Sequence, residues 1–131
     1  MMRHGCALAA VMALSLAATA ARADAPDRHQ SCFPVGTSWT NWSAAPGGDV
    51  LYLRVHINDI YRVDLTPGSR VYKSPGYFLV NVVRGSGWIC SAIDLDLSLA
   101  GDYGYRKPLI VTSLRKLTPA EIAAIPKRDL P

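Results

Sequence analysis

The sequence predicts a mainly β fold: a small antiparallel sheet or partly open barrel of about six strands, with a short C-terminal helix. Two observations support this class. Apolar residues alternate with polar ones in several runs of strand length, and Gly- and Pro-containing turns separate these runs. A third observation concerns the end of the chain, where a capping signature precedes one short helical segment.

The first 23 residues predict a cleaved signal peptide. A basic start at Arg3 is followed by an apolar run from Cys6 to Ala20, which at 15 residues is too short to span a bilayer. Ala21-Arg22-Ala23 fits the small-residue pattern of a cleavage site. We therefore expect a periplasmic or secreted bacterial protein, and no later segment is apolar enough to predict a membrane span.

Cleavage would leave 108 of the 131 residues, which suits one domain. We expect a mobile leader over residues 24–31, a single β-rich domain over residues 32–126 and a frayed tail over residues 127–131. The net charge of +4 falls to +2 once Arg3 and Arg22 are removed. So small a positive charge argues against a nucleic-acid binder.

Cys32 and Cys90 are the cysteines that remain after the signal peptide is removed. No C-x-x-C motif or Cys/His cluster supports a metal site or a reactive thiol, although both remain alternatives. In an exported chain a structural disulfide is the favoured interpretation. In the chain-entropy model, whose basis is disputed, closing so long a loop stabilises the fold by about 4 kcal/mol.

The first half of the domain predicts a strand over residues 38–42 and then a hairpin of residues 51–57 and 61–65. A two-residue turn would place Val55 opposite Arg62 and mix the buried and exposed faces. We therefore predict a three-residue loop over residues 58–60. This loop pairs Ile57 with Tyr61 and sets Arg54 opposite Asp64.

Two longer apolar runs follow the hairpin. Residues 77–83 are nearly continuously apolar, which predicts a central strand or one buried on both faces. Residues 87–97, which contain Cys90, predict the central strand of the fold. Its apolar residues change face part-way. Either both faces are covered or a bulge near residues 91–93 turns Asp94 and Asp96 toward solvent, and we predict the bulge.

The last elements are a loop over residues 101–106, a strand over residues 109–114 that starts after Pro108, and a helix. Thr118-Pro119-Ala120-Glu121 combines a threonine cap, a proline at the first helical position and the glutamate of a capping box. Ile122 and Ile125 are expected to dock this helix on the sheet.

Four short motifs resemble those of a family of small exported bacterial proteins catalogued only as a domain of unknown function. They are Cys32-Phe33-Pro34, residues 61–65 (Tyr-x-x-Asp-Leu), residues 87–91 (Gly-Trp-Ile-Cys-Ser) and residues 117–121 (Leu-Thr-Pro-Ala-Glu). The resemblance covers roughly residues 32–126. It implies a type of fold and an exported protein, but no activity. Proteins of this kind often carry a second cysteine pair. Here Ser69 and Pro108 occupy those regions, so a second disulfide is not expected.

The chemistry-bearing residues support an enzyme only weakly. Asp94, Asp96 and Asp102 offer oxygen ligands for a hard cation such as Ca²⁺, and with His56 they would make a metal-assisted hydrolase the alternative function. No complete metal-loop signature is present, and His56 is expected to be exposed on a strand opposite Arg62. The sequence predicts no cofactor.

A binding or interaction module is the leading hypothesis. Tyr52, Tyr103 and Tyr105 form the candidate binding surface, because exposed aromatic side chains suit recognition. Trp39 or Trp42 is a further candidate, although each is more readily explained as a core residue. The partner would be another envelope protein or a small ligand.

Overall fold

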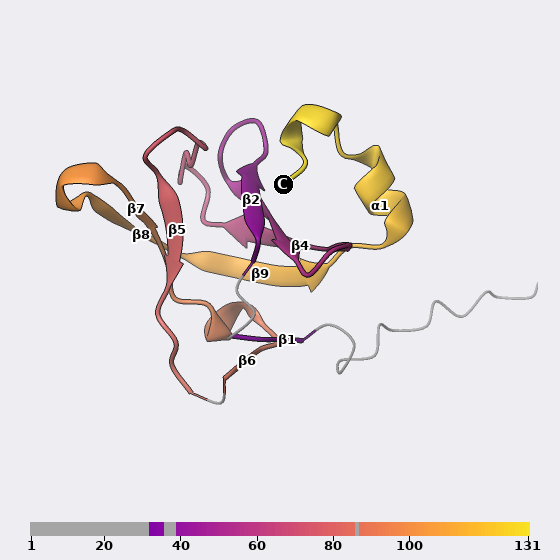
Figure 1. The fold of residues 1–131 in the computed structure, drawn as a ribbon, viewed down its shortest axis with the longest axis horizontal. Helices are drawn as coiled ribbons and strands as arrows, with labels where there is room; N and C mark the ends of the chain where they lie inside the picture. The colour runs from indigo at the N-terminus through magenta and orange to yellow at the C-terminus, as the bar shows by residue number, and fades with distance from the viewer. Residues whose placement is uncertain (1–31, 36–38, 86) are drawn as a thin grey trace, which may run out of the picture.

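The computed structural model describes residues 32–35, 39–85 and 87–131. The predicted signal peptide (1–23) and leader (24–31) lie outside the described residues. The described chain is mainly β, as predicted, with three antiparallel sheets and one short C-terminal α-helix, and the sheets do not close into a barrel (Figure 1).

The strands are short and distributed over the three sheets. A two-stranded sheet pairs β1 (Phe33–Pro34) with β6 (Trp88–Ile89). A four-stranded sheet has the order β2 (Asn41–Ala44), β3 (Val50–Val55), β4 (Asp59–Leu65), β9 (Val111–Lys116). A three-stranded sheet has the order β5 (Phe78–Asn81), β7 (Leu97–Ala100), β8 (Arg106–Leu109).

The β3–β4 hairpin has a three-residue loop, but the loop is His56-Ile57-Asn58 rather than residues 58–60. Leu53 lies opposite Tyr61, and Val55 lies opposite Asp59. The loop therefore lies two residues earlier than predicted, and the partner of Tyr61 lies four residues before the predicted Ile57. An even shift keeps every side chain on its own face, so the alternation of the sequence fixes the face of each residue but not the position of the loop.

The shifted register also corrects two predicted neighbours. Arg54 lies opposite Ile60 instead of Asp64. Asp64 instead accepts a 2.8 Å hydrogen bond from Nε of Arg62, two residues earlier on the same strand. His56, predicted on a strand opposite Arg62, is an exposed loop residue with a φ of 56°.

Residues 87–97 are not the central strand that the sequence predicted. The chain leaves β6 after Ile89, makes a 3-10 turn η2 (Ala92–Asp94) and enters β7 in a different sheet. The change of apolar face thus reflects a turn between two sheets, where a bulge was predicted. Asp94 and Asp96 are partly exposed, and Ile93 is 91% exposed.

Residues 77–83 are likewise not a central strand. Among the described strands, β5 lies at the edge of its sheet and pairs with β7 alone. Leu79 is buried, whereas Phe78 is 53% exposed on the opposite face. The apolar residues of this run therefore lie on a buried face and on an exposed face. Composition alone does not distinguish this arrangement from a strand that is buried on both faces.

The predicted last strand is longer than residues 109–114 and is interrupted at Ile110, giving β8 and β9. Pro108, predicted at the start of the strand, instead lies inside β8, opposite Ser98 of β7. The amide of Gly101 donates to the carbonyl of Tyr105, which shows which residues of β8 bond to β7. Because only alternate residues do so, the backbone nitrogen of Pro108 points away from β7, toward the outer edge of the sheet. The missing N–H group therefore removes no hydrogen bond.

The helix α1 (Pro119–Ala124) begins where the sequence predicts. Thr118 Oγ1 accepts from the amide of Glu121 at 3.3 Å, and Glu121 Oε2 accepts from the amide of Thr118 at 2.9 Å. The tail beyond it was predicted to be frayed, and this is wrong. The 3-10 turn η4 (Lys127–Asp129) follows, and Arg54 donates from Nε and Nη2 to the oxygen of Pro131 at 2.9 and 2.6 Å.

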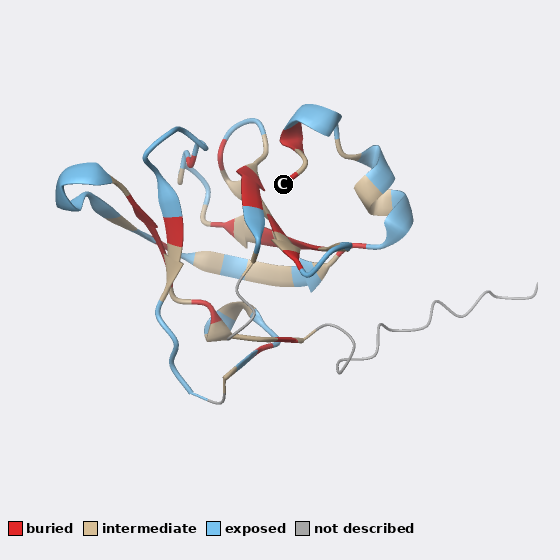
Figure 2. Cartoon of the chain, in the orientation of Figure 1, coloured by how far each residue is buried: buried red, intermediate tan, exposed pale blue. Residues whose placement is uncertain are grey.

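The core lies on the inner faces of the sheets, where buried positions concentrate on the central strands (Figure 2). Phe33 of β1 packs edge-on against Tyr61 of β4, with ring centroids 4.7 Å apart. The predicted disulfide is confirmed: Cys32, which precedes β1, is bonded to Cys90, which follows β6. The disulfide therefore ties the start of the domain to residues that follow the second strand of the same small sheet.

Candidate functional site

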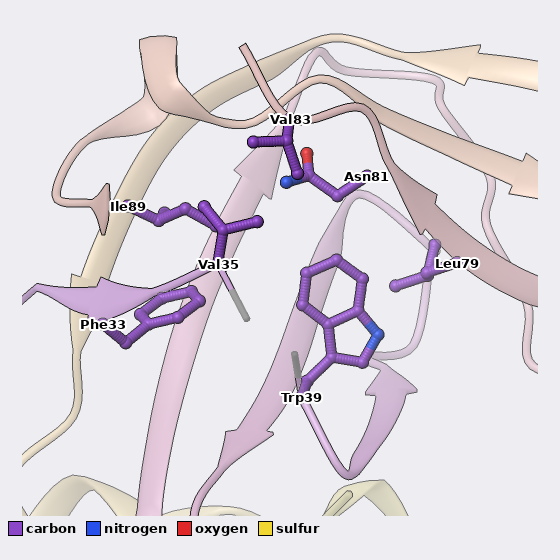
Figure 3. A pocket seen from close by; sticks show the side chains of 7 residues that line it. All are labelled: Phe33, Val35, Trp39, Leu79, Asn81, Val83 and Ile89. Carbon is purple, nitrogen blue, oxygen red and sulfur yellow. The ribbon is translucent and has the colours of Figure 1, made fainter. Parts of the chain in front are cut away.

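A cavity of about 330 Å³ opens beside the edge strand β5, and we refer to it as the β5 cavity. Its volume is at the small end of the range for ligand sites, roughly 300–1,000 Å³. Six of its seven lining residues are apolar. Figure 3 shows all seven side chains: Phe33, Val35, Trp39, Leu79, Asn81, Val83 and Ile89.

Three separate parts of the chain form the walls of the β5 cavity. Phe33 and Ile89 come from the small β1–β6 sheet, and the disulfide and a 2.8 Å hydrogen bond from the amide of Val35 to the carbonyl of Gly87 hold this sheet together. Trp39 precedes β2 and is only partly buried against the core. Leu79 comes from β5. A disulfide-linked sheet thus faces an edge strand across the cavity.

Asn81 is the polar residue of the β5 cavity. Its Oδ1 accepts a 2.9 Å hydrogen bond from the amide of Asp96, which fixes the orientation of the side-chain amide. Its Nδ2 atom is buried and has no hydrogen-bond partner among the described residues. In Figure 3 this nitrogen lies beside the side chain of Val83, on the wall of the cavity. The described lining of the β5 cavity therefore combines six apolar side chains with one unused hydrogen-bond donor.

A second hollow, of about 270 Å³, lies beside α1. Tyr52, Arg62 and Arg115 contribute to it from the four-stranded sheet, and residues of α1 and its flanks complete it. Both arginines are already paired, Arg62 with Asp64 and Arg115 with Glu121 at 2.6 Å. No donor is left buried and unpaired among its described lining residues, so we regard it as the weaker candidate.

The structure does not bring the three predicted tyrosines together. Tyr52 borders α1, whereas Tyr103 and Tyr105 belong to the loop between β7 and β8, at the opposite end of the molecule in Figure 1. Tyr103 is fully exposed, and Tyr105 packs edge-on against Tyr77 with ring centroids 5.5 Å apart. Of the two tryptophans, Trp42 is a core residue, and Trp39 lines the β5 cavity.

The three aspartates of the metal hypothesis have different surroundings. Asp94 Oδ2 accepts from the amides of Cys90 and Ser91 at 3.0 and 2.9 Å, and these hydrogen bonds hold its pKa below the ordinary value of 3.8. Asp96 pairs with Arg84 at 2.7 Å. Asp102 is exposed in the β7–β8 loop.

No group of three or more His, Cys, Asp or Glu side chains suited to a metal ion occurs within residues 32–35, 39–85 and 87–131. Asp94 instead closes the turn after β6. In the same described residues, no helix has the length and apolarity needed to cross a membrane.

Comparison with protein-family models, curated proteins and solved structures found no match to this chain. The resemblance to a family of exported proteins, stated from short motifs, therefore stays a prediction.

Sequence reasoning did not identify Asn81 or the β5 cavity. The signal that was available is Asn81 itself, the single polar side chain within residues 77–83. An amide inside an apolar run predicts either a hydrogen-bonded core position or a site. The structure shows that one half of the amide is bonded and the other half is not.

Proposed function

We propose that this protein is an exported binding module whose ligand occupies the β5 cavity. The observation that carries the proposal is the buried Nδ2 donor of Asn81, which has no partner among the described residues and lies beside a cavity whose other described lining side chains are apolar. An unsatisfied buried donor costs about 1–3 kcal/mol. A ligand whose acceptor reaches Nδ2 after the side chains that cover it move aside recovers this free energy on binding, and Trp39 and Leu79 provide apolar contact.

Export is supported by the signal-like pattern of residues 1–23 and is compatible with the disulfide, because disulfides persist in oxidising compartments. A cavity lined mostly by apolar side chains, with one donor, suits recognition better than catalysis. Its described lining residues include no nucleophile, acid or base.

The test is a screen of small aromatic amides and carboxylates by ¹H–¹⁵N NMR on the purified protein. We expect binders to shift the indole N–H resonance of Trp39 and the side-chain amide resonances of Asn81. The N81D variant keeps the acceptor for Asp96 but loses the donor, so it should bind at least about tenfold more weakly. N58D, which makes the same change in the exposed β3–β4 loop, is the matched control.

Binding that is equally strong in N81D, N58D and the wild type would contradict a role for the β5 cavity. A screen in which compounds shift only the resonances of the hollow beside α1, such as those of Tyr52 and Leu117, would transfer the proposal to that site.

A further inference from the structure

β5 leaves one row of backbone hydrogen-bonding groups unused. The amide of Val82 donates to the carbonyl of Asp96 at 3.0 Å, which fixes the alternation of the β5–β7 ladder. In an antiparallel pair only alternate residues bond to a given neighbour. The backbone N–H and C=O groups of Leu79 and Asn81 therefore point away from β7. Within the part of the chain that the structure describes, no hydrogen bond reaches them.

This edge lacks two of the features that protect edge strands from pairing, although β5 itself spans only four residues. Residues 77–83 contain no charged residue and no proline, either of which commonly blocks an edge. The outer face of the strand exposes Phe78 (53%) and Val82 (38%), and Val83 is 54% exposed. Contiguous exposed apolar surface on an edge strand is typical of a surface that binds another chain.

We propose that the ligand of the β5 cavity is an extended peptide that adds to β5 as a further strand. This inference rests on the proposed function and names its ligand class. The peptide backbone pairs with the unused groups of Leu79 and Asn81. Alternate peptide side chains point to the inner face, where the β5 cavity receives one apolar side chain. An acceptor on the peptide bonds Nδ2 of Asn81.

A second copy of the protein is the less favoured occupant of this edge. In the register centred on Val80, which uses the unused groups of both residues within β5, antiparallel pairing of two β5 strands sets Leu79 of one copy opposite Asn81 of the other. Residues directly opposite in a pair lie on the same face of the sheet. The Nδ2 donor would then meet a hydrocarbon side chain, whereas an independent peptide can present an acceptor there.

The experiment selects binders from a phage-displayed library of random heptapeptides on the purified protein. Each synthetic binder is then methylated at one backbone nitrogen at a time, and dissociation constants are measured by calorimetry. Methylation removes one donor and adds bulk on one side of the peptide. We expect losses of about tenfold or more at every second residue and little effect between them, because only alternate N–H groups face β5. N81D should weaken binding, and N58D should not.

Four results would overturn the inference, and the first three separate it from the proposed function. Peptides that depend on Asn81 but show no period-two pattern, or small compounds that bind the β5 cavity when no peptide does, would leave a binding cavity without strand addition. A concentration-dependent dimer that excludes the peptides would identify a second copy as the occupant. If neither compounds nor peptides reach the β5 cavity, both proposals fail together.

Discussion

Removing the disulfide should cost the protein a large part of its stability. Cys32 and Cys90 are 58 residues apart in the sequence, and in the chain-entropy model closing such a loop contributes about 4 kcal/mol to the free energy of unfolding. The total free energy of unfolding of a domain of this size is only about 5–15 kcal/mol. The C32S/C90S variant should therefore remain folded at low temperature but with a much smaller free energy of unfolding.

The assay is urea unfolding followed by tryptophan fluorescence. With a slope of about 1.5 kcal/mol per molar urea, the midpoint should fall by roughly 2–3 M. Wild-type protein kept reduced with dithiothreitol is the control, and its midpoint should match that of the variant. A loss below about 1 kcal/mol in both samples would refute the reasoning, because it would mean that the reduced unfolded chain is already restricted.

Three further predictions concern other parts of the fold. G48A should lower the free energy of unfolding by about 3 kcal/mol or more in urea unfolding, because its φ is +75° and a Cβ atom would lie 2.4 Å from the backbone nitrogen of Val71. G47A, where φ is +96° and nothing lies within 4 Å, should lose only about 1–2 kcal/mol, and equal losses would contradict the clash. L51A should cost about 2–5 kcal/mol because Leu51 is fully buried, while I57A, at 82% exposed, should change stability by less than about 0.5 kcal/mol. D94N should lower the melting temperature at pH 7, and the difference should shrink as the pH falls below 3.8, since a carboxylate with a lowered pKa stabilises the fold only while it is ionised. A difference that persists unchanged to pH 2 would contradict that role of Asp94.

The sequence was most informative where a local rule decides the structure. The cap at Thr118 and the proline after it predicted the start of α1. The alternation in β3 and β4 predicted which residues face the core, but it could not place the loop, because a shift by two residues preserves the faces.

The sequence was least informative where distant segments meet. Residues 87–97 look like one strand, yet they divide between two sheets, because Phe33 and Leu109 belong to different partner strands. Nothing local to Ile89 or Leu97 indicates this. The residues that line the β5 cavity are spread between positions 33 and 89 of the sequence, so only the fold brings Trp39 and Asn81 to one site.

Amide hydrogen exchange tests most directly whether the edge of β5 beside the cavity pairs with a bound strand. The amides of Leu79 and Asn81 should exchange quickly in the free protein. When a selected heptapeptide is bound, their exchange should slow by about tenfold or more, the protection expected from one new hydrogen bond at each amide. Val80 is the internal control, because its amide already faces β7 in the ladder. Exchange at Leu79 and Asn81 that is unchanged by a saturating peptide would contradict this pairing.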